Sequence, residues 1–297
     1  MKRTGSLILA IVMVIAIAAS MVGCTPAAKL NFGKELLGVT SQLDALQGLK
    51  KGDADIAVID SVMAGYYMNQ TEEFKDYQVL ENVVFAEEQY GIAAKKGNEA
   101  LMSKINEALI ALVATDYQTV AAKYGLTTEL LVKADTQNPY ASATDNSWNN
   151  VVADKEIIIG YTLFAPIAYK DGDGADAKLV GFDIELAEAV VSYLNTTYET
   201  DVKVTFMVID WDSKEALLEN GTIDLVWNGM TITDERSEAM TISVPYLANK
   251  QVAIIAKADA AKYNAANYDE FVTKAADAVI AVEKGSAGEG IVAVDEE

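Results

Sequence analysis

The sequence contains no histidine, and this absence excludes whole classes of site. Catalytic triads that use histidine and zinc sites with histidine ligands cannot be built, and general acid–base chemistry near neutral pH loses its usual side chain. Cysteine occurs once, as Cys24, so no intramolecular disulfide bond can form. We therefore expect no catalytic residues and no cofactor.

Positive charge is also scarce, because 23 Lys and Arg residues stand against 44 Asp and Glu residues, which gives a formal net charge of -21. Nucleic acid is not expected as a partner, since phosphate binding needs clustered Lys and Arg. An anionic membrane surface would repel such a chain, so any membrane contact must come from a tether. With 51% hydrophobic residues, the 297-residue chain is long enough for two globular domains.

Residues 1–23 differ from the rest of the chain. Lys2 and Arg3 form a positive start, an almost wholly apolar run follows, and small residues precede Cys24. This pattern is typical of a secretory signal. The position of Cys24 resembles a bacterial lipoprotein signal, in which the acylated cysteine becomes the new N-terminus, although Met21 stands where Leu is usual. A plain signal peptide or an uncleaved anchor helix is the alternative.

Short apolar runs alternate with helical patterns over the rest of the chain, which predicts an α/β fold with mainly parallel sheets. Residues 101–124 and 182–194 have helical spacing. Strands are expected at residues 56–59, 91–94, 156–160, 202–209, 223–227, 252–255 and 278–282.

Two stretches are rich in turn-forming residues. Residues 134–149 are polar and small, and they are the best candidate for an internal linker, with an ordinary long surface loop as the alternative. Residues 170–178 carry three Asp near glycines, but their spacing does not match an EF-hand. We expect a solvated turn there and no metal site.

Five sequence blocks resemble the type II solute-binding proteins of amino-acid ABC transporters (bacterial extracellular solute-binding proteins, family 3). The most specific are Gly-Met-Thr-Ile-Thr-Asp-Glu-Arg at residues 229–236 and Val-Gly-Phe-Asp-Ile at residues 180–184. Three more lie at residues 46–60, 90–97 and 282–289. The resemblance covers nearly the whole chain after the signal. It implies an α/β, two-lobed, periplasmic-binding-protein-like type II fold with two hinge crossings.

The order of the blocks departs from the family, in which the blocks at residues 46–60 and 90–97 come last. Each block occurs once, which is the pattern of a circular permutation whose old termini are joined by residues 134–149. A gene-assembly artefact or a domain-swapped dimer is the alternative. A monomer is preferred, because the linker is long and polar enough to close the loop. A single permuted chain requires Leu30 and the segment ending at Glu297 to be neighbours.

This order divides the chain into unequal segments. The hinge crossings are expected near residues 85–91 and 248–251. The segments are a signal peptide at 1–23, a tether at 24–29, the first part of lobe 2 at 30–88, lobe 1 at 92–250, including the linker 134–149, and the second part of lobe 2 at 251–297.

A free amino acid is a zwitterion, so its site needs a fixed cation, a fixed anion and backbone donors. Arg236 stands where the family places its carboxylate-binding arginine, and its planar fork suits a carboxylate. Thr231 and the amide of Gly229 are expected to add donors. Ser286 and Ala287 follow a strand and open a predicted helix, whose free amides suit the same carboxylate. A surface ion pair between Arg236 and an adjacent acid is the alternative.

The other side of the ligand would meet different residues. Asp60 ends a buried-type strand and matches the family Asp that accepts the ligand ammonium; a helix N-cap is the alternative. Phe164 and Trp211 match the two aromatic walls of the side-chain pocket, with core packing as the alternative. Tyr161 and Asn228 are expected to border the pocket. Some relatives carry an acid near Tyr161 that holds a basic side chain, so a Lys or Arg ligand is less expected here than a polar or neutral one.

The resemblance implies a substrate-binding lipoprotein that captures an amino acid by hinge closure and delivers it to an ABC permease. The protein would lie outside the cytoplasm, lipid-anchored to the cell membrane through Cys24. A dehydratase-like enzyme on the same scaffold, a sensor module and a degenerate lipoprotein that binds nothing are the alternatives.

Overall fold

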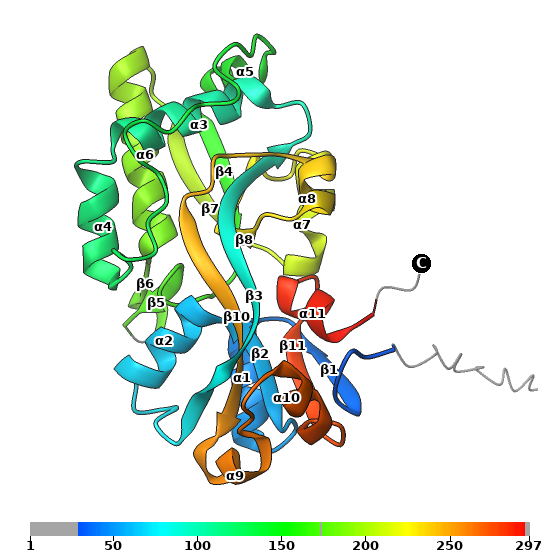
Figure 1. The fold of residues 1–297 in the computed structure, drawn as a ribbon. Helices are drawn as coiled ribbons and strands as arrows, with labels where there is room; N and C mark the ends of the chain where they lie inside the picture. The colour runs from blue at the N-terminus through cyan, green and yellow to red at the C-terminus, as the bar shows by residue number, and fades with distance from the viewer. Residues whose placement is uncertain (1–28, 173, 295–297) are drawn as a thin grey trace, which may run out of the picture.

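The computed structural model describes residues 29–172 and 174–294. The predicted signal peptide and Cys24 lie outside these residues, as does Glu297. No helix within the described ranges is long and apolar enough to cross a membrane. The molecule has an upper part with helices α3–α8 and a lower part with α1, α2 and α9–α11, and two long strands, β3 and β10, run through both (Figure 1).

A nine-stranded mixed sheet runs through the described part of the molecule. Its order is β1 (Glu35–Val39), β11 (Val279–Glu283), β2 (Ile56–Asp60), β10 (Leu247–Ala256), β3 (Tyr77–Lys95), β8 (Leu225–Thr231), β4 (Glu156–Tyr161) and β7 (Lys203–Val208), and β9 (Met240–Ile242) pairs with β3. A separate hairpin pairs β5 (Tyr169–Asp171) with β6 (Lys178–Val180).

The sequence predicts a mainly parallel sheet, and this prediction is wrong for the strands at the centre of the molecule. Pairing is parallel at the two ends, β1–β11–β2 and β8–β4–β7. In the middle, β10 pairs antiparallel with β2 and β3, and β3 pairs antiparallel with β8. The first half of β3 contains only one short apolar run, at residues 83–86, which was not predicted as a strand; only its last residues, 91–94, were.

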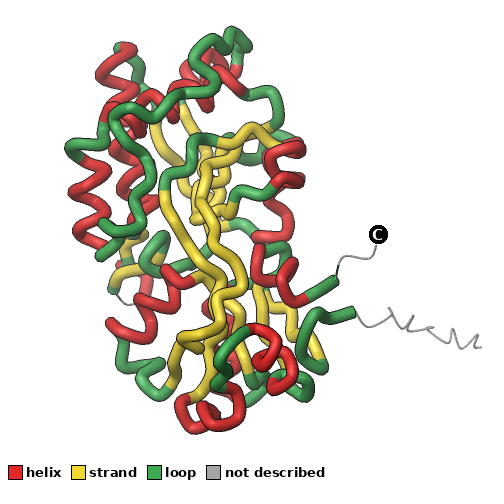
Figure 2. The backbone as a smooth tube through the Cα atoms, in the orientation of Figure 1, coloured by secondary structure: helices red, strands yellow, loops and turns green. Residues whose placement is uncertain are grey.

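Helices cover both faces of this sheet (Figures 1 and 2). The helical stretch predicted at residues 101–124 is two helices, because the chain turns at residues 112–115. The helices are α1 (Gln42–Lys51), α2 (Ser61–Gln70), α3 (Glu99–Ala111), α4 (Asp116–Tyr124), α5 (Ser147–Asp154), α6 (Phe182–Tyr198), α7 (Lys214–Glu219), α8 (Asp234–Ala239), α9 (Ala260–Tyr263), α10 (Tyr268–Lys274) and α11 (Ala287–Val292).

The two described ends of the chain lie side by side in the lower part (Figure 1). Leu30 and Ala293 form an antiparallel bridge, and the Asn31 amide donates to the Val292 carbonyl at 2.8 Å. Phe32 belongs to the same buried cluster as Val292. Segments from opposite ends of the sequence therefore complete one hydrophobic core.

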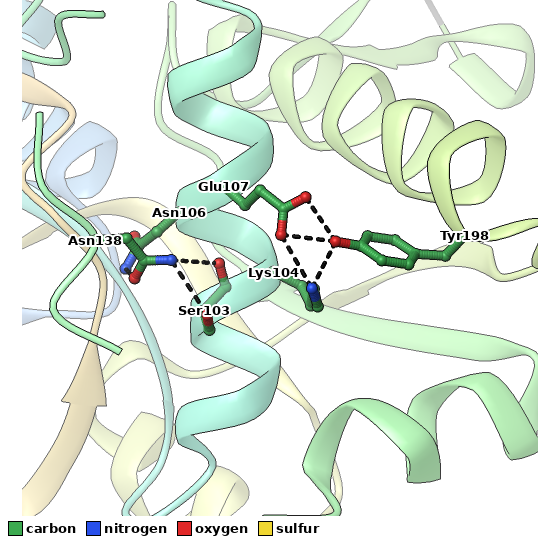
Figure 3. Close-up of polar contacts among 6 residues, drawn as sticks. All are labelled: Ser103, Lys104, Asn106, Glu107, Asn138 and Tyr198. Carbon is green, nitrogen blue, oxygen red and sulfur yellow. Dashed lines mark hydrogen bonds and ion pairs between the residues drawn. The ribbon is translucent and has the colours of Figure 1, made fainter. Parts of the chain in front are cut away.

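Residues 134–149 form hydrogen bonds with α3, and Figure 3 shows those of Asn138. Asn138 donates from Nδ2 to the carbonyl oxygen of Ser103 at 2.9 Å and accepts at Oδ1 from Asn106 at 3.2 Å. Further along, Asp145 accepts a hydrogen bond from the Ala100 amide at 2.7 Å, within the first turn of α3. This segment thus supplies an acceptor that the first turn of the helix needs.

Candidate ligand-binding site

A small cavity of about 10 Å³ lies where the upper and lower parts meet. Nine residues predicted from the sequence line it: Asp60, Phe164, Trp211, Asn228, Gly229, Thr231, Arg236, Ser286 and Ala287. Four further residues complete the lining: Gln42, Thr162, Gln251 and Glu283. Residues distant in the sequence therefore converge on one space.

Gly229 shapes the upper wall of the cavity at a position where a side chain does not fit. Its φ is +62°, and an added Cβ would lie 2.7 Å from Cε1 of Phe164 and 3.0 Å from Cε2 of Tyr90. The Gly229 amide donates to Oδ2 of Asp183 at 2.8 Å. In this arrangement the Gly229 amide therefore donates to Asp183 and not towards the cavity, where it was predicted to meet a ligand carboxylate.

Asp183, in the first turn of α6, was not predicted from the sequence. Its side chain is 1% exposed, and Oδ2 also accepts a hydrogen bond from the Tyr246 hydroxyl at 2.7 Å. Burial raises the pKa of Asp183 to about 7. Asp183 thus holds the backbone of Gly229 from behind the cavity wall.

Arg236 lies in α8 and is 9% exposed. Thr233 caps this helix by accepting from the Arg236 amide at 3.1 Å. The guanidinium donates from Nη1 to the Thr231 carbonyl at 2.8 Å and from Nη2 to the Gly285 carbonyl at 2.9 Å. No described carboxylate lies within ion-pair distance of Arg236, so the ion pair considered as its alternative role is not formed. Burial lowers the pKa of Arg236.

Lys214 is a second buried cation beside the cavity, and it was not predicted from the sequence. It is 2% exposed, and its Nζ donates to the Gly285 carbonyl at 3.0 Å and to the Trp211 carbonyl at 3.2 Å. The carboxylate of Glu215 lies 3.2 Å from the same nitrogen. Burial, and then the charge of Arg236, lower the pKa of Lys214. Gly285 therefore accepts hydrogen bonds from two cations of the upper part.

The turn at Gly285 leads into α11, as predicted. Ser286 caps the helix by accepting from the Glu289 amide at 3.1 Å, and the Glu289 carboxylate accepts from the Gly285 amide at 2.7 Å. This Ser-x-x-Glu spacing closely resembles a capping box. It fixes the start of the helix, where Ser286 and Ala287 line the cavity.

Asp60 forms the floor of the cavity at the end of β2. Although it directly precedes α2, its side chain makes no helix-capping hydrogen bond, so the N-cap alternative is not what the structure has. Instead the carboxylate accepts from the side-chain amides of Gln42, Asn249 and Gln251, the last at 2.6 Å. Burial, and then the nearby carboxylate of Glu88, raise the pKa of Asp60.

Glu88 joins this floor to the two long strands. Its Oε2 accepts from the Thr231 hydroxyl at 3.0 Å, from Asn249 at 2.9 Å and from Gln251 at 3.0 Å. Glu88 lies in β3, and its partners lie in β8 and β10. The polar network below the cavity therefore connects three neighbouring strands.

Glu283 lines the cavity but was not predicted from the sequence. It ends β11, is 4% exposed, and its Oε1 has no hydrogen-bond partner among the described residues. Burial, and then the carboxylate of Asp60, raise the pKa of Glu283 to about 8. The rule that indicated Asp60, an acid at the carboxyl end of a buried strand, could have indicated Glu283 as well.

The aromatic residues separate into two groups. Phe164 and Trp211 line the cavity and are 4% and 5% exposed, and both also belong to buried clusters, so they serve cavity and core together. Tyr161 does not line the cavity; its ring packs edge-on against Phe206, with 6.3 Å between centroids. Its neighbour Thr162 faces the cavity instead and contacts Asn228, with 2.9 Å between the two side chains.

Residues 157–287 match the family model of bacterial extracellular solute-binding proteins, family 3. This part of the chain is similar to that family. Residues 157–287 include every lining residue of the cavity except Gln42 and Asp60.

Known proteins similar to part of this chain are named as binding proteins. A probable histidine-binding protein of Neisseria gonorrhoeae is 36% identical over 94 residues, 32% of this chain and 32% of the relative. The arginine-binding extracellular protein ArtP of Bacillus subtilis (strain 168) is 36% identical over 100 residues, 33% of this chain and 35% of the relative. The chain thus spans about a third of the length of these relatives.

A solved structure is similar over a comparable share. It is an ABC uptake transporter substrate-binding protein from Streptococcus pneumoniae with bound histidine, at 38% identity. The match covers 33% of this chain and 36% of that chain, with a TM-score of 0.26.

Proposed function

We propose that the protein captures a free amino acid in the cavity between its two parts. One observation carries this proposal: the buried guanidinium of Arg236, from the upper part, and the buried carboxylate of Asp60, from the lower part, line the same cavity. A zwitterion offers each of them a partner of opposite charge. The relatives named above as amino-acid-binding proteins support the same ligand class.

Closure of the two parts would then accompany binding. The ligand carboxylate would accept the hydrogen bonds that the Arg236 guanidinium now donates to the carbonyls of Thr231 and Gly285. The ligand ammonium would approach Asp60. Because each part holds one end of the ligand, binding favours the closed arrangement. We propose β3 and β10 as the hinge, with lobe 1 at residues 92–250 and lobe 2 at residues 30–88 and 251–297.

The similarity to family 3 supports a cellular setting for this function. We propose that the protein is monomeric, acts outside the cytoplasm, is anchored to the membrane through Cys24, and delivers its ligand to an ABC permease. Binding without turnover is favoured over dehydratase-like catalysis, since the relatives named above are binding proteins. Incubation with prephenate-like acids, followed by product analysis, distinguishes an enzyme from a binding protein.

The permuted block order is part of this proposal. The bridge between Leu30 and Ala293 supports it, because the two segments lie adjacent although they are far apart in the sequence. A rearranged chain, residues 147–294 joined by a short glycine linker to residues 30–133, should fold as a monomer and keep the ligand affinity. A rearranged chain that is unfolded, or a parent protein that is dimeric by light scattering, would contradict the monomeric permutant.

The test of binding uses the protein without its predicted signal peptide. A panel of the twenty amino acids in a thermal-shift assay should raise the melting temperature for a subset, and calorimetry gives the affinity. Arg236→Ala should lower that affinity by at least about 100-fold, because the ligand carboxylate loses two charge-assisted hydrogen bonds. Lys50→Ala, which removes an exposed cation paired with Glu73, is the control. A panel in which no amino acid binds would refute the proposal.

A further inference from the structure

The charges that line the cavity do not balance against a simple zwitterion. The lining carries one cation, Arg236, and two acids, Asp60 and Glu283. The carboxylate and ammonium of an amino acid can pair with Arg236 and Asp60. Glu283 is then left buried and unpaired, which is unfavourable for a carboxylate in a low-dielectric site.

Neither of the two buried cations nearby, Lys214 and Arg236, forms an ion pair with Glu283 in the described part of the chain. Lys214 is a nearby candidate, but its three donor positions are already directed to the carbonyls of Trp211 and Gly285 and to the carboxylate of Glu215. Arg236 directs both terminal nitrogens at backbone carbonyls. Within the described part of the chain, Oε1 of Glu283 has no hydrogen-bond partner.

A second acceptor in the same lining is also without a donor. Oε1 of Gln251 is buried and has no partner among the residues that the structure describes. The orientation of this amide is fixed, because its Nε2 donates to the carboxylates of Asp60 and Glu88 and an oxygen in that place could not. The cavity wall therefore contains two buried side-chain oxygens, one of Glu283 and one of Gln251, that have no hydrogen-bond partner among the described residues.

We propose that Glu283, assisted by the side-chain carbonyl of Gln251, binds a second positive charge and selects amino acids with cationic side chains, such as lysine, arginine or ornithine. Ammonium and guanidinium groups carry donors only, so they fit acceptors that have no donor of their own. This subsite is on β11 and β10, not at Tyr161, whose ring packs away from the cavity. The proposal rests on the proposed function and deepens it.

The protonation of Glu283 is consistent with this role. Burial and Asp60 raise its pKa to about 8, which favours the protonated carboxyl group near neutral pH. A cationic side chain would favour the ionised form, and the proton would leave to solvent. A neutral ligand would leave Glu283 protonated.

The test compares arginine with citrulline, which replaces the guanidinium with a neutral urea group of similar shape, and lysine with norleucine. Calorimetry on the wild-type protein should show that each cationic ligand binds at least about tenfold more tightly than its neutral partner. This comparison needs no variant, so it does not depend on how a mutant folds.

Glu283→Gln, which mimics the protonated acid, should weaken lysine and arginine binding by roughly 10- to 100-fold and change neutral ligands by less than about threefold. Glu72→Gln, an exposed acid, controls for net charge and should change neither. Equal affinity for arginine and citrulline, or unchanged lysine affinity in Glu283→Gln, overturns the inference while the proposed function stands. Binding of neither class by the wild-type protein overturns both.

Discussion

Arg236 donates a hydrogen bond from Nη2 to the carbonyl oxygen of Gly285 at 2.9 Å, and this bond joins α8 of the upper part to the turn before α11 in the lower part. The same carbonyl accepts from Nζ of Lys214 at 3.0 Å. Two buried cations of the upper part therefore donate to one backbone oxygen of the lower part. A ligand carboxylate would compete for Arg236 but leave Lys214 in place.

Lys214→Met should test this connection. Methionine keeps most of the apolar stem but removes the hydrogen bond to Gly285, so the two parts should separate more readily. We expect a larger radius of gyration for the ligand-free protein in small-angle X-ray scattering and roughly tenfold weaker ligand binding. Lys50→Met, at an exposed ion pair, is the matched control. An unchanged radius together with unchanged affinity would show that Lys214 has no part in closure.

Gly229→Ala should damage the cavity wall. An alanine Cβ would lie 2.7 Å from Phe164 and 3.0 Å from Tyr90, and the φ of +62° adds backbone strain for a residue with a side chain. We expect a loss of about 1–3 kcal/mol in the free energy of unfolding and weaker ligand binding. Denaturant unfolding and calorimetry measure the two effects.

Gly65→Ala provides the comparison, since an added Cβ there meets nothing within 4 Å. Its helix α2 should tolerate or favour alanine. If both alanine variants behave alike, the close approach at Gly229 is not what limits the site.

Local patterns in the sequence were enough to predict some of the site but not all of it. Asp60 follows from the rule for acids at strand ends, and Arg236 follows from its sequence block. Tyr161 and Thr162 show the limit, because neighbouring residues in an extended chain point to opposite sides and only the backbone at the end of β4 decides which one meets the cavity.

Lys214 and Asp183 could not have been found in this way. Lys214 acts on a carbonyl 71 residues away, and Asp183 on an amide 46 residues away. Nothing around Lys214 in the sequence distinguishes it from a surface charge. Asp183 lies in the block at residues 180–184, but that block alone does not show which backbone amide its carboxylate accepts from. The same holds for the antiparallel centre of the sheet, where strands far apart in the sequence pair. The permuted order of the blocks, by contrast, is visible only in the sequence and stays a prediction.

The stability of the ligand-free protein should fall as the pH rises from 5.5 to 8.5. The pKa of Asp183 is raised to about 7 and that of Glu283 to about 8, so the folded protein binds these protons more tightly than the unfolded chain. Their contribution to stability is complete below the ordinary carboxyl pKa values of 3.8 and 4.5 and is lost as the pH passes 7 and 8.

Differential scanning calorimetry across this range measures the effect. Acids with lowered pKa values, such as Glu73 and Asp145, titrate below the range and do not obscure it. Glu283→Gln should make the melting temperature less dependent on pH, because one of the titrating groups is gone. A melting temperature that rises with pH in the wild-type protein would contradict the assignment.

Asn138→Ala should loosen residues 134–149 without affecting ligand binding. Asn138 bonds to Ser103 and Asn106 of α3 (Figure 3), so alanine removes both contacts and leaves the Asn106 side chain without this partner. We expect a loss of about 1–2 kcal/mol in the free energy of unfolding and faster proteolysis within this segment. Gln137→Ala is the control, because that side chain donates only to the backbone of Asp135. A drop in ligand affinity equal to that of the cavity variants would mean that the segment does more than connect α4 to α5.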